Sequence, residues 1–137
     1  MSEEMNFVRP EEVSAFAFDW GRLSLTVAPE VNGAKNFSGG VVDLPSRQGH
    51  ARHNHPGAEE IILVLSGDGE QMVEDENGVP VTQKVRAGCT IFIPERRFHS
   101  TLNTGKGPMQ LFVVYSPAGP ELALRDLPDF HVVKRGT

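Results

Sequence analysis

The sequence is poor in several features that usually mark a protein class. It has a single cysteine, Cys89, and a single tryptophan and tyrosine among its 137 residues. One cysteine excludes an internal disulfide framework, and its position inside the run CTIFI indicates a small buried side chain rather than a nucleophile. No stretch approaches the roughly 20 apolar residues that a membrane-spanning helix requires. The sequence therefore predicts neither a disulfide scaffold nor a membrane partner.

Clustered basic charge is also lacking. The formal net charge is -5, and no run of lysine or arginine is longer than two residues, as at Arg96-Arg97. Because a nucleic-acid surface needs clustered cations along the phosphate backbone, we do not expect a nucleic-acid partner. The first residues, MSEEMNFVRPEE, are acidic, whereas a secretory signal is basic and then apolar. We therefore expect a cytoplasmic protein.

Glycine and proline, by contrast, are plentiful and spread along the whole chain. The 14 glycines and 10 prolines suit many short strands joined by tight turns better than long helices. A chain of this length has room for one hydrophobic core, since domains usually have roughly 100–200 residues. Apolar runs such as IILVL, TIFI and LFVVY can supply that core. The sequence thus predicts one all-β domain over residues 1–137.

The apolar runs and the turn residues between them predict about eight strands. These lie at 23–27, 39–45, 61–69, 90–94, 99–103 and 109–117, with a hairpin over 70–85 whose tip is Asn77-Gly78. We expect a core at about 39–117, an N-terminal arm at 1–20 and a C-terminal tail at 118–137. Residues 121–126 are the one segment predicted to be helical, with Glu121 and Arg125 spaced for an i,i+4 ion pair.

The strand that contains IILVL, at 61–65, is apolar on both faces. A strand of this kind is usually covered on both sides. The core supplies one cover, and we expect a second subunit to supply the other. Apolar residues on both terminal arms, such as Phe16 and Phe130, also need cover. The sequence therefore predicts a homodimer.

Four side chains could converge on a metal ion. His53 and His55 are two residues apart, so in an extended strand both imidazoles project from the same face. Glu60 follows the turn-forming pair Pro56-Gly57 and can present a carboxylate to the same point. His99, on a later strand, could close the set from the opposite side. Singly, such residues are more often solvated histidines or strand-end charges, and His50 is at most a supporting residue.

Taken together, these residues resemble the two motifs of the cupin superfamily. The first motif reads His53-x-His55-x4-Glu60-x6-Gly67. The second reads Gly88-x5-Pro94-x4-His99-x3-Asn103, so eight positions agree in type and spacing. The resemblance implies a double-stranded β-helix, which is a barrel of two antiparallel sheets with the metal inside. It does not imply a reaction, because cupins include oxygenases, isomerases, decarboxylases, lyases and plain binding proteins.

The sequence departs from the cupin pattern at two positions. Arg47 stands where the first motif begins with glycine, and Gly49 is displaced from that place by two residues. Arg96 stands where the second motif usually has glycine. At Arg47 we expect a different approach of the chain to the site. If the turn at Arg96 requires positive φ, that arginine costs about 1–2 kcal/mol. The four predicted ligands are unaffected.

Three imidazoles and one carboxylate suit a divalent ion of iron, manganese, cobalt, nickel or zinc. An octahedral ion bound by these ligands keeps two positions for a chelating substrate, or for a substrate with water or dioxygen. A closed tetrahedral zinc would be structural instead. We expect the open arrangement, because a small barrel with an apolar core does not need a metal to fold.

The predicted pocket wall is mostly apolar, with few polar groups. By alternation along the strands, its candidates are Ile62, Val64, Thr101 and either Phe92 or Ile91. Gln110 is the candidate polar addition, and Phe112 is a further candidate. Such a wall favours a small chelating organic ligand over a phosphate ester, although phenylalanines are more often core residues. The leading hypothesis is a dioxygenase; the alternatives are a redox-neutral isomerase or lyase, and a noncatalytic small-molecule-binding protein. No catalytic residue is assigned.

Overall fold

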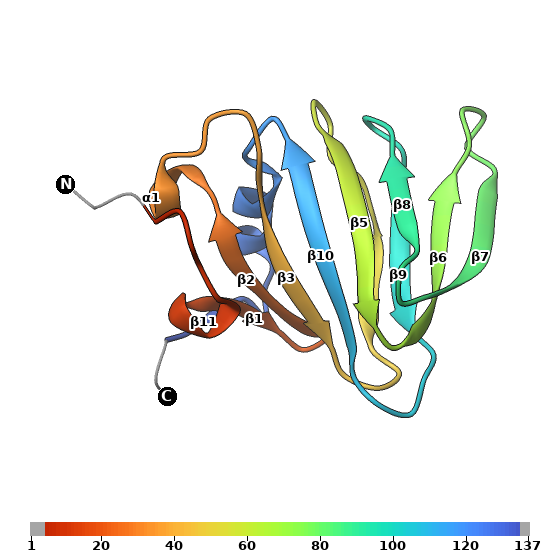
Figure 1. Ribbon diagram of the computed structural model, residues 1–137. Helices are drawn as coiled ribbons and strands as arrows, with labels where there is room; N and C mark the ends of the chain where they lie inside the picture. The colour runs from red at the N-terminus through yellow and green to blue at the C-terminus, as the bar shows by residue number, and fades with distance from the viewer. Residues whose placement is uncertain (1–4, 135–137) are drawn as a thin grey trace.

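Two antiparallel β-sheets make up the structure, which is a computed structural model and describes residues 5–134 (Figure 1). The larger sheet has seven strands in the order β11-β1-β2-β3-β10-β5-β8. Their bounds are β1 (Ala15–Phe18), β2 (Gly21–Val27), β3 (Ser38–Leu44), β5 (Glu59–Ser66), β8 (Thr90–Ile93), β10 (Met109–Ser116) and β11 (His131–Val133). The smaller sheet has four strands in the order β4-β9-β6-β7. Their bounds are β4 (Gly49–His53), β6 (Asp68–Glu74), β7 (Pro80–Arg86) and β9 (His99–Asn103).

Helical structure is confined to three short segments of the described chain: η1 (Pro10–Glu12), α1 (Pro29–Asn32) and η2 (Pro120–Asp126). None of the helices within residues 5–134 has the length and apolar character needed to span a membrane. The two antiparallel sheets confirm the predicted all-β, double-stranded β-helix architecture.

Strand alternation separates the core from the outer surface. On β5, Ile62 and Val64 are 2% and 1% exposed, whereas Ile61 and Leu65 are 47% and 41% exposed. Successive side chains of a strand point to opposite faces, so the first pair lies in the core and the second pair lies outside. Phe92 on β8 pairs with Ile61 in register and is 55% exposed. We call Ile61, Leu65 and Phe92 the outer β5–β8 patch.

The N-terminal segment joins the larger sheet instead of forming a separate arm. Residues 1–4 lie outside the described chain, and residues 15–18 form β1, which pairs with β2 on one side and β11 on the other. Phe16 and Phe18 on β1 are buried. The sheet therefore extends well beyond the predicted core at 39–117, because the apolar side chains of both end segments pack into it.

The predicted helix at 121–126 is a 3₁₀ helix, and the expected ion pair is absent from it. Glu121 is buried and accepts a hydrogen bond from the Ser38 hydroxyl at 2.5 Å. Arg125 instead lies 3.6 Å from a carboxylate oxygen of Glu30. A 3₁₀ helix has three residues per turn, so positions i and i+4 do not share a face. The prediction was wrong because it assumed α-helical spacing.

Asn103, the last residue of the second motif, has a structural role. It is fully buried at the end of β9. Its side-chain amide lies within hydrogen-bond distance of the carbonyl oxygens of Leu44, Pro45 and Gly107, at 3.0, 3.2 and 2.9 Å. The two amide protons are thus shared among the last carbonyl of β3 and two carbonyls of the neighbouring loops. Asn103 thus connects the end of the smaller sheet to the end of β3 in the larger one.

Candidate functional site

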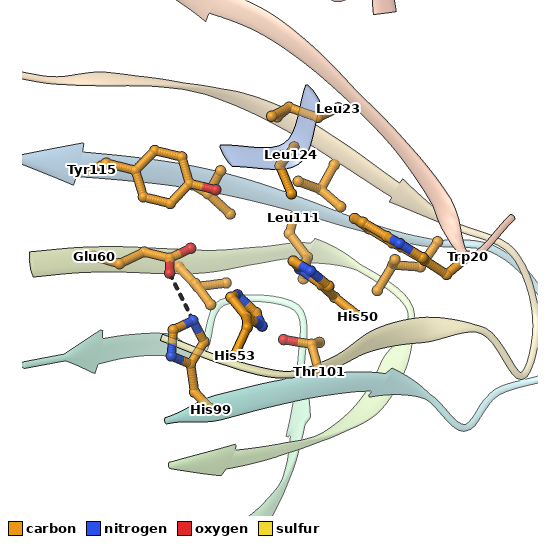
Figure 2. Close-up of a pocket in the computed structure, with 14 residues that line it drawn as sticks. Trp20, Leu23, His50, His53, Glu60, His99, Thr101, Leu111, Tyr115 and Leu124 are labelled. Atoms are coloured by element: carbon orange, nitrogen blue, oxygen red, sulfur yellow. Dashed lines mark ion pairs between the residues drawn. The ribbon is translucent and has the colours of Figure 1, made fainter. Parts of the chain in front are cut away.

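The four predicted ligands come together inside the barrel. One potential ligand atom from each of His53, His55, Glu60 and His99 lies within 4.8 Å of all the others. His53 ends β4 and pairs in register with His99, the first residue of β9. Glu60 projects from β5 of the other sheet, and its carboxylate points toward His99 (Figure 2). The cluster therefore lies between the two sheets and depends on both.

His55 reaches the cluster from a loop and not from a strand. The strand β4 ends at His53, and a turn follows in which the Ala58 amide donates to the His55 carbonyl at 3.2 Å. The expectation that His53 and His55 share one face of a strand is therefore corrected. The turn, which contains Pro56-Gly57, brings His55 round to the same point.

Backbone hydrogen bonds determine the tautomers of two histidines. The Nδ1 atom of His53 lies 2.7 Å from the Ala51 carbonyl oxygen, and Nδ1 of His99 lies 2.9 Å from that of Arg97. A carbonyl oxygen can only accept, so each Nδ1 carries the proton and donates. In a neutral imidazole the Nε2 atom then offers a lone pair. This is the usual arrangement of a metal-ligating histidine, in which the second nitrogen is held by a backbone carbonyl.

Three polar atoms at the centre of the cluster are buried without a hydrogen-bond partner in the described part of the chain. They are Nε2 of His55, Nε2 of His99 and Oε1 of Glu60. The two nitrogens lie 3.3 and 3.1 Å from that oxygen. Buried polar atoms are rarely left unsatisfied unless an ion or water belongs there. A cation among these atoms would satisfy all three, so the residues present fit a divalent metal ion.

The protonation states of the cluster also suit a metal. Burial alone would raise the pKa of the Glu60 carboxyl, but interactions with His55 and His99 outweigh it and hold that pKa below its ordinary value. Burial, followed by the neighbouring His50 and His99, lowers the pKa of His53 to about 2. Glu60 is therefore an anion and His53 a neutral imidazole at pH 7, the forms that bind metals.

A cavity adjoins the cluster. Its lining consists of Trp20, Leu23, Val42, Leu44, His50, His53, Glu60, Ile62, His99, Thr101, Leu111, Val113, Tyr115 and Leu124. The centre of a water molecule can move through about 30 Å³ of it, so the cavity admits a molecule of only a few non-hydrogen atoms. Ile62 and Thr101, two of the predicted wall residues, line this cavity. The other four predicted wall residues lie elsewhere.

The register of β10 explains why two of the predicted wall residues, Gln110 and Phe112, do not line the cavity. Gln110 and Phe112 alternate with Leu111, Val113 and Tyr115, and the latter three face the cavity. Gln110 donates a hydrogen bond to the carboxylate of Asp43 at 3.0 Å. Apolar residues occur at both odd and even positions of β10. Only the pairing of β10 with β5 shows that the odd-numbered residues face inward.

Phe92 and Val64 are the other two predicted wall residues that do not line the cavity. Phe92 belongs to the outer β5–β8 patch and points to solvent. Val64 faces inward like Ile62, but it lies farther along β5 and packs in the core. Distance along the strand, and not side-chain direction, removes Val64 from the cavity wall.

A stack of aromatic rings leads from the β1–β2 turn to the cluster. Trp20 stacks on His50 with ring centroids 4.2 Å apart, and His50 stacks on His53 at 3.7 Å. Figure 2 shows these rings in succession along one side of the cavity. Burial lowers the pKa of His50 to about 4, so its ring is neutral at pH 7. Sequence reasoning assigned Trp20 to an arm and missed its place in the wall.

Tyr115 is a second wall residue that sequence reasoning missed. Its side chain is 6% exposed, and its ring packs edge-on against His55 at 5.1 Å. Burial, and next the negative charge of Glu60, raise its pKa well above the ordinary value. The hydroxyl points into the cavity (Figure 2). It is the single tyrosine of the chain, and a phenol within a largely apolar strand was the available signal.

The two departures from the cupin pattern both occur at left-handed backbone. Arg47 has φ 67° and Arg96 has φ 70°. Within residues 5–134 these are the non-glycine residues with positive φ. The turns therefore require the conformation that glycine adopts most easily, and each arginine is strained there.

The charge of the cavity restricts what it can bind. A divalent ion with the Glu60 carboxylate leaves a formal charge of +1. No lysine or arginine of the described chain lines the cavity. The other side chains of the wall are neutral, so one negative charge on a ligand balances the site and a second would be buried without compensation.

Comparison with protein families and curated sequences gives a consistent result. A family model described as "Cupin domain" matches residues 40–115. Germin-like protein 1 of Brassica napus is 32% identical over 99 residues, which are 72% of this chain and 47% of that protein. The chain thus spans about half the length of this curated relative. Trp20 and Leu124, which line the cavity, lie outside the family match.

Solved structures share the fold. The oxalate decarboxylase of Lactobacillus farciminis, in a formate complex, superposes with a TM-score of 0.70 at 20% identity, over 89% of this chain and 33% of that one. An uncharacterised protein with a double-stranded β-helix domain from Klebsiella pneumoniae gives 0.69 at 17% identity, over 96% of this chain and 99% of that one. The superpositions show a common fold, and at these low identities they show the fold alone.

Proposed function

We propose that this chain, which belongs to the cupin family, holds one divalent metal ion through His53, His55, Glu60 and His99 and acts on a small chelating organic molecule. The observation that carries the proposal is the set of three buried atoms without partners at the centre of the cluster. Iron, manganese, cobalt, nickel and zinc all suit these donors.

An open site is favoured over a closed structural zinc. The ligand side chains His53, Glu60 and His99 also line the cavity, so a bound ion has space on that side. A structural zinc is instead enclosed by its four protein ligands. The apolar core that surrounds the cluster further supports a barrel that folds without metal.

For an open metal site that binds a chelating substrate, we propose dioxygenase activity first. A redox-active ion would activate a chelated substrate and dioxygen together, which requires no protein nucleophile. Cleavage of a small enol or 1,3-dicarbonyl compound between carbons, with both oxygen atoms incorporated, gives a carboxylic acid and a 1,2-dicarbonyl compound and consumes no other reductant. The protein supplies an apolar wall that excludes water, from Leu23, Leu111 and Leu124 among others.

A redox-neutral lyase is the second candidate. It is suggested by the structural likeness to oxalate decarboxylase. The charge of the cavity argues against oxalate itself, because its second negative charge would face no lysine or arginine of the described chain. A lyase acting on a singly charged substrate agrees with the same site.

The proposed function is tested by oxygen consumption. Protein loaded anaerobically with Fe(II) should consume dioxygen with acetylacetone as substrate, and His55→Ala should abolish this activity. His131→Ala, which changes an exposed histidine on β11, serves as the matched control and should retain it. Equal turnover with zinc in place of iron, or in the absence of oxygen, would show that the chemistry is redox-neutral. Binding of a chelator without turnover of any tested substrate would show that the protein is a noncatalytic binding protein.

We also propose that the protein forms a homodimer through the outer β5–β8 patch. Ile61 and Phe92 are cross-strand neighbours and about half exposed. Adjacent exposed apolar side chains of this kind are typical of protein interfaces. The N-terminal η1 segment and β11 occupy the opposite end of the same sheet, so they leave the patch accessible (Figure 1).

A further inference from the structure

We infer that the Tyr115 hydroxyl donates a hydrogen bond to an oxygen of the chelating substrate, and that this substrate is a small monoanion. The inference rests on the proposed metal-dependent function and specifies its substrate class. Tyr115 is thereby a positioning residue for the ligand and not a ligand of the metal.

The position of Tyr115 follows from strand pairing. Tyr115 on β10 is the register partner of Glu60 on β5, and both side chains face the inside of the barrel. Neighbouring residues in such a pair have Cβ atoms about 4.5–5.5 Å apart. A substrate bound beside Glu60 therefore lies beside Tyr115 as well.

The hydroxyl of Tyr115 is available to a ligand. The residue is more than nine-tenths buried, and within residues 5–134 the hydroxyl has no hydrogen-bond partner. The hydroxyl oxygen is not one of the three partnerless buried atoms of the cluster, so it is open to the cavity and its proton can be donated to a ligand there. Since the hydroxyl points into the cavity (Figure 2), a ligand oxygen there would supply the missing acceptor.

The hydroxyl of Thr101, which also lines the cavity, already donates its proton within the protein. It donates to the side-chain oxygen of Gln71 at 2.5 Å, and both residues are buried. Because a hydroxyl has one proton to donate, Thr101 cannot also donate to a ligand. Tyr115 is therefore the hydroxyl donor that the wall leaves for substrate.

Charge and size define the substrate class. The formal charge of +1 at the loaded site is balanced by one negative charge, and the wall supplies no lysine or arginine within the described chain. The cavity admits a few non-hydrogen atoms and is otherwise apolar. A hydroxamate or enolate of a short aliphatic compound has one negative charge, few atoms and an apolar remainder, as this cavity requires. Oxalate is of similar size but carries a second negative charge.

The experiment compares two small chelators on protein loaded with Co(II), whose visible spectrum reports binding. Acetohydroxamate is the monoanionic probe and oxalate the dianionic one. The variants are Tyr115→Phe, which removes the hydroxyl, and Phe112→Tyr, which adds one on the opposite face of the same strand. Metal content is measured first for each protein.

We expect acetohydroxamate to bind the wild type and Phe112→Tyr equally and to bind Tyr115→Phe about 10- to 100-fold more weakly, as for a lost hydrogen bond to a charged group. Oxalate should bind the wild type more weakly than acetohydroxamate. Equal affinity of wild type and Tyr115→Phe at equal metal content would overturn the role of Tyr115. Oxalate binding as tight as acetohydroxamate would overturn the monoanion assignment.

A second measurement uses no variant. Tyr115 is the single tyrosine, so the tyrosine bands of an ultraviolet resonance Raman spectrum report on it alone. Acetohydroxamate should change the hydrogen-bond-sensitive tyrosine doublet of Zn(II)-loaded wild type. Unchanged bands at saturation would contradict the inference, whereas failure of the protein to take up any metal would instead contradict the proposed function.

Discussion

Glu60 and Tyr115 are register partners on adjacent strands, which places a buried carboxylate beside a buried phenol on the inner face of the barrel. Glu60 belongs to the histidine cluster, and Tyr115 lines the adjoining cavity. The candidate metal cluster, to which β4 and β9 of the smaller sheet also contribute, therefore meets the proposed ligand site at β5 and β10. Changes to the histidines should affect metal retention, whereas changes to the wall should affect ligand binding.

His99→Ala should sharply lower the metal content. Wild-type protein is expected to hold about one divalent ion per chain, and loss of one chelating ligand weakens the hold of the others. Elemental analysis after gel filtration measures the content. His131→Ala is the control, because His131 is exposed and outside the cluster. Equal metal content in His99→Ala and the control would contradict the proposed site.

The outer β5–β8 patch should hold the dimer together. Light scattering of the wild type is expected to give about twice the 15.0 kDa chain mass. Ile61→Lys combined with Phe92→Lys should give the mass of a single chain, because charges buried at an interface are costly. Leu102→Lys changes an exposed apolar residue of the other sheet and should leave the dimer intact. A monomeric wild type would count against the interface.

Arg96→Gly should stabilise the protein relative to Arg96→Ala. Both variants remove a side chain that is 77% exposed, and only glycine relieves the positive φ of 70°. The relief is about 1–2 kcal/mol, reduced by the greater flexibility of glycine in the unfolded chain. We therefore expect a difference of about 1 kcal/mol in urea unfolding. An alanine variant as stable as the glycine variant would show that the turn is not strained.

The metal-free protein should lose stability as the pH falls from 6.5 toward 4. Burial holds the pKa of His50 at about 4, below its ordinary value of 6.5. Between these values the unfolded chain binds a proton that the folded chain does not, so acid favours unfolding. At pH 7 this contribution is fully present, and it amounts to about 1–3 kcal/mol.

The variant His50→Phe tests the source of that pH dependence. It keeps an aromatic ring between Trp20 and His53 but cannot take up a proton. Urea unfolding at pH 7, 6 and 5 should show a smaller decline in the free energy of unfolding than in the wild type. His131→Phe should follow the wild type. An undiminished decline in His50→Phe would assign the acid sensitivity to other groups.

The candidate metal ligands could be predicted because three of them are close in the sequence and the fourth, His99, has its place in the second cupin motif. The separations among His53, His55 and Glu60 fit within one strand, one turn and the start of the next strand. The pocket wall could not be predicted as well, because it depends on pairing between distant strands. On β10 apolar residues occur at both odd and even positions, so the sequence analysis chose Phe112 and missed Tyr115, and the register with β5 shows that Tyr115 faces inward.

The terminal segments were the least predictable part of the fold. Phe16 and Phe130 need apolar surroundings, and sequence alone does not distinguish a partner subunit from the chain's own sheet. In the structure the two rings pack against each other, with centroids 5.4 Å apart. Glu121 was similarly assigned to a surface ion pair, because nothing local indicates that Ser38 lies next to it.

Pairing of β1 with β11 has a consequence for how the chain folds. Ala15 is the register partner of Val133, so this contact joins residues far apart in the sequence. Contacts of long sequence separation slow folding, because the loop between them must close first. During synthesis, β1 can gain its second neighbour only after residue 133 has left the ribosome. Until then β1 presents an unpaired edge, which makes the nascent chain prone to association with other exposed strands.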